Sequence, residues 1–204
     1  MKKKIVALCL CIALAVVAIG GATLAYFTDT KTATNTFTVG NVNITLTEDK
    51  WDATKAKLIP GTTIEKNPTV AVVKGSEECY VRILMTISNS EAWDDIFDDD
   101  STLKIEDFFT GYDSDSWTYI KNTENTDNTR TYEFRYKEAV NALNATDNVA
   151  LPALFTAVNV PSTLTGTQIA TLNGFNIVIV AQAIQTASFN GNVDAAWTAF
   201  DNQN

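Results

Sequence analysis

Residues Cys79 to Asn89 read C-Y-V-R-I-L-M-T-I-S-N, and their side chains alternate between two kinds at every step. One set is apolar throughout: Cys79, Val81, Ile83, Met85 and Ile87. The other set is mixed: Tyr80, Arg82, Leu84, Thr86 and Ser88. Successive side chains of a β-strand point to opposite faces of the sheet. The pattern therefore predicts a strand with one apolar face, on which Cys79 is a small buried residue rather than a reactive thiol.

A second strong strand is predicted at Phe175 to Gln185, where Ile177-Val178-Ile179-Val180 is apolar on both faces. Such a run is typical of a central strand in a sheet that is covered on both sides. Val193 to Phe200 then closes the chain as a predicted short helix.

A hairpin is predicted from Trp117 to Lys121 and Thr131 to Val140, with the polar tract Asn122 to Arg130 as a long loop between them. In its second arm the aromatic residues Tyr132, Phe134 and Tyr136 alternate with the charged residues Glu133, Arg135 and Lys137. This indicates one buried and one solvated face. The aromatic stripe has the spacing of a sandwich core, and contact with a sugar is the alternative.

Further strands are predicted along the chain, with turn signals at short intervals. Val42, Ile44 and Leu46 belong to one, Thr62 to Val73 to another, with Pro68 at an edge or an irregularity, and Leu154 to Val160 to a third. The pattern as a whole predicts an all-β fold. Its expected form is a two-sheet antiparallel sandwich of jelly-roll type, with short helices in insertions and at the C-terminus.

An acidic insertion is predicted at residues 90–115, with one or two short helices. It contains the aspartates Asp94, Asp95, Asp98, Asp99 and Asp100. These lack the D-x-[DN]-x-[DN]-G order of a calcium loop. A solvated acidic face is the favoured interpretation, and a calcium site is the alternative.

The first 25 residues have the three regions of an export signal. Lys2 to Lys4 are basic, Ile5 to Ile19 are apolar, and Thr23-Leu24-Ala25 supplies small residues before a cut between Ala25 and Tyr26. Residues 26–204 are then a single β-sandwich domain in the mature protein. The alternative is an uncleaved anchor, since the apolar run is just long enough to span a bilayer.

Composition excludes several classes of function. The formal charge of −9 becomes −12 when Lys2, Lys3 and Lys4 are removed, and an acidic chain without a basic block repels nucleic acid. The chain has no histidine, which excludes a Ser-His-Asp triad, an H-E-x-x-H protease and every His-ligated metal site. Only Cys79 lies beyond residue 25, so no disulfide framework holds the domain. No cofactor or metal site is predicted.

Several stretches resemble the TasA/camelysin family of secreted biofilm matrix fibre proteins of Gram-positive bacteria. They are G-G-A-T-L-A-Y-F-T-D-T (Gly20 to Thr30), F-x-V-G-N-V-N-I-T-L (Phe37 to Leu46), L-I-P-G (Leu58 to Gly61), E-C-Y-V-R-I-L-M (Glu78 to Met85) and the final A-x-A-I-Q strand with D-A-A-W-T-A-F. The resemblance implies a jelly roll, a dedicated signal peptidase and fibre growth by donor-strand exchange. Some members carry a metalloprotease label, which the absence of histidine argues against here.

For this sequence, the resemblance implies that residues 26–37 are the donor strand. It begins Tyr26, Phe27, Thr28, Asp29, Thr30, Lys31 and ends at Phe37. An exposed strand edge offers unpaired backbone groups to such a segment, and a head-to-tail contact builds a homopolymer. The alternative is that the leader pairs within its own subunit or frays.

The leading function is a secreted, non-catalytic structural protein of the extracellular matrix or cell surface, with other matrix proteins or polysaccharide as further candidate partners. A monomeric adhesin or carbohydrate-binding sandwich that uses Trp93, Trp117 or the acidic loop is the alternative. A hydrolase with paired carboxylates is the third hypothesis, and it has no recognisable motif.

Overall fold

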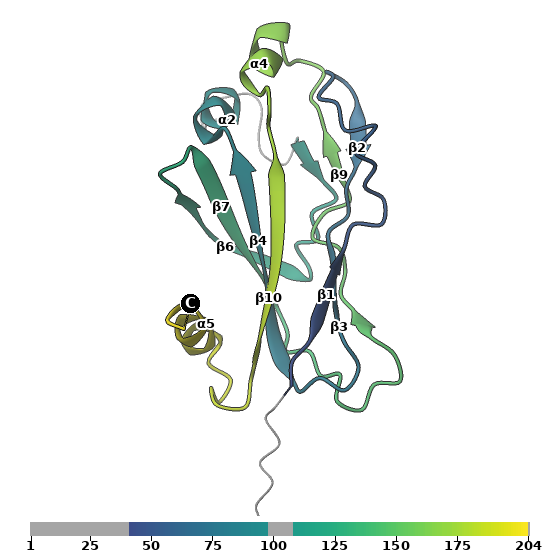
Figure 1. The fold of residues 1–204 in the computed structure, drawn as a ribbon, viewed down its shortest axis with the longest axis vertical. Helices are drawn as coiled ribbons and strands as arrows, with labels where there is room; N and C mark the ends of the chain where they lie inside the picture. The colour runs from purple at the N-terminus through teal and green to yellow at the C-terminus, as the bar shows by residue number, and fades with distance from the viewer. Residues whose placement is uncertain (1–40, 98–107, 204) are drawn as a thin grey trace, which may run out of the picture. The chain divides into compact units, whose positions relative to one another are not determined.

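The computed structural model describes residues 41–97 and 108–203, and strands predominate in both ranges (Figure 1). All of these residues belong to one unit that spans Gly40 to Asn204. The strands are β1 (Ile44–Thr47), β2 (Thr63–Glu65), β3 (Thr69–Val72), β4 (Cys79–Ser88), β5 (Phe109–Thr110), β6 (Trp117–Glu124), β7 (Thr129–Tyr136), β8 (Val149–Ala150), β9 (Ala157–Asn159) and β10 (Ile177–Gln185). The helices are α2 (Ser90–Phe97), α4 (Gly166–Thr171) and α5 (Val193–Asp201).

The described strands form three sheets in which every pairing is antiparallel. The main sheet has the order β10-β4-β7-β6, and the two smaller sheets have the orders β1-β3-β8 and β2-β9-β5. The all-β class is confirmed. By hydrogen bonding, the described strands form three sheets instead of the predicted two. The jelly-roll arrangement stays a prediction.

The third sheet arises where one strand was expected from Thr62 to Val73. The structure has two strands there, β2 and β3, in different sheets. They are separated by residues 66–68, and Pro68 has no backbone N–H to donate to a ladder. The predicted irregularity at Pro68 is therefore confirmed, and the single strand is wrong.

One continuous core fills the space between the main sheet and the two smaller sheets. The predicted apolar face of β4 is confirmed, because Cys79, Val81, Ile83, Met85 and Ile87 are all buried. They share a cluster with the buried residues of the smaller sheets, among them Ile64, Val70, Val72 and Val158.

The outer face of the main sheet is covered in part by α5, which sequence analysis did not foresee. Arg82 of β4 and Glu133 of β7 are only 3% and 4% exposed, although Glu133 was assigned to a solvated face. The Arg82 guanidinium lies 4.4 Å from the centre of the Trp197 ring of α5 and forms an ion pair with Asp201. The prediction of a solvated face is wrong here, because the final helix returns over these strands.

The predicted hairpin is confirmed, but its strands are longer than expected. β6 extends to Glu124 and β7 begins at Thr129, so only residues 125–128 form the loop. Asn128 has a left-handed φ of 56°, a conformation that asparagine adopts more readily than most residues. The predicted long loop is therefore wrong.

A helix is also confirmed in the acidic segment, where α2 packs Trp93 and Ile96 into the core. Asp98, Asp99 and Asp100 lie outside the described residues. Among the described helices, none is long and apolar enough to cross a membrane.

Candidate functional site

The residues to which sequence analysis assigned a function lie outside the described ranges. They are the cleavage residues Ala25 and Tyr26, and the donor-strand residues Phe27, Thr28, Asp29, Thr30, Lys31 and Phe37. The structure therefore describes only surfaces that such a segment would meet. Two features stand out among the described residues: a free strand edge and an aromatic cavity.

The free edge belongs to β10, which was predicted to be a central strand. Among the described strands it lies at the end of the main sheet, so the prediction of a central strand is wrong for this part of the chain. The side chains of Val178 and Val180 are 47% and 44% exposed, whereas a doubly covered strand would bury them. The local sequence resembles that of a central strand, because β10 is apolar on both faces even though its outer face is only partly covered.

The backbone of β10 divides into two alternating sets. Ser88 donates to the Asn176 carbonyl and Thr186 donates to the Glu78 carbonyl, so the even-numbered positions pair with β4. The odd-numbered positions direct their N–H and C=O groups away from β4: Ile177, Ile179, Ala181, Ala183 and Gln185. Within the described ranges, no backbone hydrogen bond satisfies these outward groups.

Strand β1 lies alongside part of β10 without joining its ladder. Val73 donates to the Asn43 carbonyl, so the odd positions of β1 pair with β3. Ile44 and Leu46 then direct their backbone groups away from β3. Two strands of different sheets therefore each leave one set of backbone groups without a ladder partner among the described strands.

The opposite edge of the main sheet, β6, is built differently. Its pairing with β7 shifts between Tyr119 and Lys121, which marks an irregularity, and it carries the charged residues Lys121 and Glu124. Bulges and charges are the usual means by which an edge strand avoids pairing with another chain. β10 has nine regularly paired residues, I-V-I-V-A-Q-A-I-Q, with no charge and no proline. Within residues 41–97 and 108–203, the edge of β10 therefore has neither the bulge nor the charges that β6 has.

The second feature is a cavity of about 660 Å³, which residues of the main sheet line together with Trp93 and Phe97 of α2 and Phe109 of β5. Its buried wall includes Met85, Trp93, Leu154, Phe155 and Tyr132. Its accessible part includes Tyr119, Asn122 and Asp94. Volume and aromatic lining are those of a site that binds a small molecule or a side chain.

Contacts between aromatic rings fix the positions of the side chains around the cavity. Trp93 stacks on Phe175 with centroids 5.3 Å apart, and it meets Phe108 edge-on at 4.8 Å. Each such pair adds about 0.5–1.5 kcal/mol to the contribution of burial. Trp93 and Trp117, which the adhesin hypothesis would use on the surface, are both 1% exposed. Neither offers an open platform for a sugar ring.

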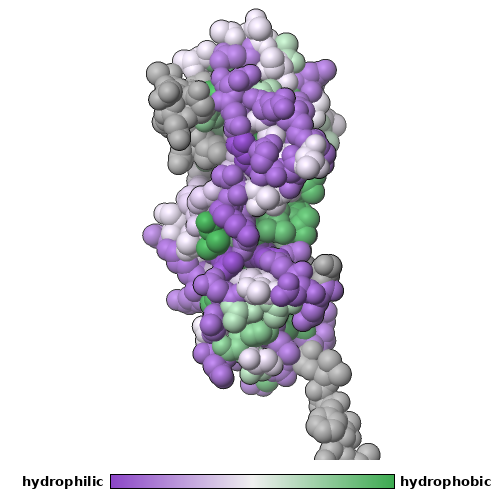
Figure 2. All heavy atoms as spheres, turned by 90° about the vertical axis from the view of Figure 1, so that its left-hand side faces the viewer, coloured by the Kyte–Doolittle hydropathy of each residue, from purple (hydrophilic) through white to green (hydrophobic). Residues whose placement is uncertain are grey.

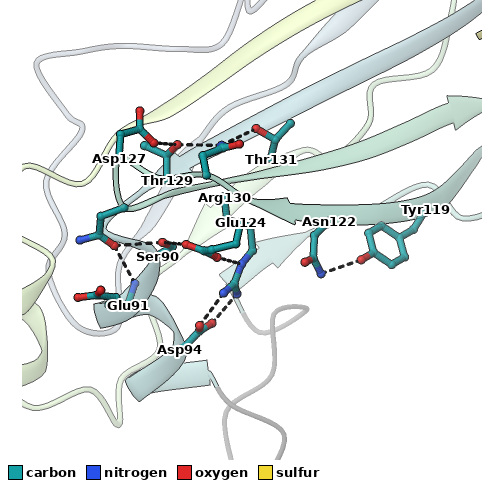
Figure 3. Close-up of polar contacts among 12 residues, drawn as sticks. Ser90, Glu91, Asp94, Tyr119, Asn122, Glu124, Asp127, Thr129, Arg130 and Thr131 are labelled. Carbon is teal, nitrogen blue, oxygen red and sulfur yellow. Dashed lines mark hydrogen bonds and ion pairs between the residues drawn. The ribbon is translucent and has the colours of Figure 1, made fainter. Parts of the chain in front are cut away.

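Arg130 lines the cavity and pairs with two carboxylates, of which only Asp94 is also part of the lining. Figure 3 shows these contacts. Its Nη2 donates to Asp94 Oδ2 at 2.6 Å, and its Nε donates to Glu124 Oε2 at 2.7 Å. Asp94 is the main cause of the raised pKa of Arg130, and burial opposes it. The two carboxylates are about half exposed, at 49% and 48% of their side chains. The trio carries one net negative charge.

The Tyr132 hydroxyl is buried and has no hydrogen-bond partner among the described residues. Burial raises the pKa of this phenol, and Arg130 opposes part of the rise. The N–H groups of Arg130 with assigned partners donate to Asp94 and Glu124. An unpaired buried hydroxyl costs about 1–3 kcal/mol, so a polar group that reached it would be favoured.

The described surface is mainly hydrophilic on the face drawn in Figure 2, with separate apolar patches. No group of three His, Cys, Asp or Glu side chains within residues 41–97 and 108–203 could hold a metal ion. Cys79 is buried, and burial raises the pKa of its thiol to about 11, which supports a structural role.

Comparison with known proteins gave a match to a family model. Residues 1–92 match the family model described as camelysin metallo-endopeptidase. No curated protein and no solved structure matches the chain. A histidine-ligated metal centre does not fit this chain, which has no histidine. The resemblance to the TasA/camelysin family is confirmed by this match, over residues 1–92 of the chain.

Proposed function

We propose that the chain is a secreted structural protein that assembles head to tail into extracellular matrix fibres. Signal peptidase frees Tyr26, and residues 26–37 of one copy add a strand to the next copy. The observation that carries the proposal is the unprotected edge of β10. The match to the camelysin family model supports secretion to the cell surface or matrix.

The outward groups of β10 supply the affinity. A strand laid along this edge satisfies N–H and C=O groups of Ile177, Ile179 and Ala181, each bond contributing about 0.5–1.5 kcal/mol net. Five to six such bonds give a few kcal/mol before apolar contacts are added. A free energy in this range suits a contact between two subunits that persists only when each subunit also contacts its other neighbour in the fibre.

The exposed valines supply the apolar part. Val178 and Val180 are nearly half exposed, and the leader contributes Phe27 and Phe37 as apolar side chains in a mainly polar segment. Complete burial of a valine contributes about 1.5–3 kcal/mol, so covering the exposed halves adds about 1 kcal/mol each. A non-closing contact of this kind yields filaments.

The fold supports the same mechanism in outline. Adding a strand beside β10 would extend the main sheet towards β1, whose outward groups also lack a ladder partner in the described strands. The finer assignment, a jelly-roll sandwich completed by the donor, belongs to this proposal.

Electron microscopy of two proteins tests it: residues 26–204, and the same chain without residues 26–36. We expect fibres from the first and monomers from the second, with the same thermal unfolding for both. Adding the synthetic segment 26–37 to fibre-competent subunits should inhibit growth by occupying the acceptor edge. Equal fibres from the truncated chain would show that strand donation is wrong.

The alternative is a monomeric adhesin or a carbohydrate-binding sandwich. The aromatic cavity is the observation that favours it, because its volume could hold a small ligand. The burial of Trp93 and Trp117 speaks against a flat sugar platform at those residues. Saturable binding to a glycan array by a strictly monomeric protein would support this alternative over fibre formation.

A further inference from the structure

We infer that the aromatic cavity is an anchor site for the freed N-terminal residue, Tyr26, of a second copy of this chain. The inference rests on the proposed function, because it names the place where one end of the donated leader is held. It assigns a ligand to a cavity that strand pairing alone leaves unused.

The chemistry of the cavity defines the ligand. Its deep part is apolar and aromatic, with Trp93, Phe155 and Met85 buried in its wall. A planar ring gains most from such surroundings, through burial and edge or face contacts. The ligand therefore has an aromatic ring rather than a chain of hydroxyl groups, each of which would lose its water in an apolar wall.

The polar groups narrow the choice further. The Tyr132 hydroxyl lacks a partner among the described residues, and a phenol could exchange a hydrogen bond with it. Near the solvent, Asp94 lines the cavity beside its partner Arg130, and its carboxylate is about half exposed. Its exposed oxygens can accept a hydrogen bond from an ammonium group next to the ring.

Processing between Ala25 and Tyr26 would create this combination. The new first residue carries a phenol ring and, on the same residue, a free α-ammonium group. Before the cut, the amide nitrogen is uncharged and is joined to residues 1–25. The site therefore selects processed subunits, and assembly is expected to follow the cut.

The test uses fibres of residues 26–204 with p-benzoylphenylalanine, a photocrosslinker that favours methionine, in place of Tyr26. Probe-bearing copies are mixed with ¹⁵N-labelled copies, irradiated and analysed by mass spectrometry. We expect the probe to crosslink to a labelled copy at the peptide containing Met85. The same probe at Phe37, the other end of the leader, should not label that peptide.

Two variants at the solvent side give matched controls. Asn122→Trp narrows the cavity, and Lys121→Trp places the same ring on the neighbouring residue, which lies outside the cavity lining. Both positions are exposed, so the fold should persist. We expect Asn122→Trp to lower the Met85 crosslink at least fivefold and Lys121→Trp to leave it unchanged.

The outcomes separate the two proposals. Crosslinks between copies that avoid the cavity overturn the anchor site and leave strand exchange intact. Crosslinks that join the leader only to its own copy overturn both. An unchanged Met85 crosslink in Asn122→Trp would also contradict the anchor site, because the ring would then reach Met85 by another route.

Discussion

A proline at Ala181 should stop assembly and leave the subunit folded. Ala181 belongs to the outward-facing set of β10, so its N–H is not used by β4. Proline is tolerated on an edge strand when its missing N–H faces away from the sheet, and the extended backbone of Val180 suits the position before a proline. The substitution therefore acts on the free edge.

The expected loss can be estimated from the groups involved. One net hydrogen bond of about 0.5–1.5 kcal/mol disappears, and the opposing carbonyl of the donor is left unsatisfied at about 1–3 kcal/mol. The sum of about 1.5–4.5 kcal/mol corresponds to a rise of about 10- to 1,600-fold in the concentration needed for assembly. Sedimentation of fibres over a concentration series measures this shift directly.

The matched control is Ile120→Pro on the other edge of the same sheet. Ile120 falls in the register shift of β6, has no paired residue in β7 and is exposed. Its variant should assemble at the wild-type concentration. Thermal unfolding of both variants checks the fold. Wild-type assembly by a folded Ala181→Pro protein would refute the role of the β10 edge.

Three further predictions concern stability and reactivity. Arg82→Ala should lower the free energy of unfolding by about 3 kcal/mol, measured in urea, because it removes the buried guanidinium that holds Asp201 and Gln182. Arg82 lowers the pKa of Asp201 below its ordinary 3.8, so this stabilisation is present above that value and is lost as the pH falls through the folded-state pKa. Unfolding midpoints from about pH 6 to about pH 2 should therefore fall less steeply in Asp201→Asn, and an equal slope would contradict the ion pair. Cys79, with a thiol pKa of about 11, should resist alkylation at about pH 8 until denaturant is added, as mass spectrometry can verify.

Local alternation predicted the parts of the fold in which neighbours along the chain decide the structure. The buried face of β4 and the β6–β7 hairpin were of this kind, since period-two patterning follows from strand geometry. Helix α2 was likewise anticipated from the spacing of its apolar residues.

The position of β10 could not be predicted in this way. The apolar run Ile177-Val178-Ile179-Val180 predicts a strand that other segments cover on both faces. Whether they do depends on where segments distant in the sequence pack. The outer face near Arg82 is covered by α5, while Val178 and Val180 remain exposed. The alternation of side chains within β10 does not distinguish the covered part of this face from the exposed part.

The aromatic cavity was missed for a related reason. Tyr132 and Phe134 formed a visible stripe, and their spacing suggested core. The cavity exists because Trp93 from α2 and Phe155 approach the same sheet without filling the space between them. Its volume depends on packing between segments far apart in sequence.

A high-resolution reconstruction of the fibre formed by residues 26–204 tests strand exchange most directly. The account predicts that residues 26–37 of each copy lie along β10 of its neighbour, hydrogen-bonded to Ile179 and Ala181. A leader folded against its own sheet, with copies joined through other surfaces, would contradict it.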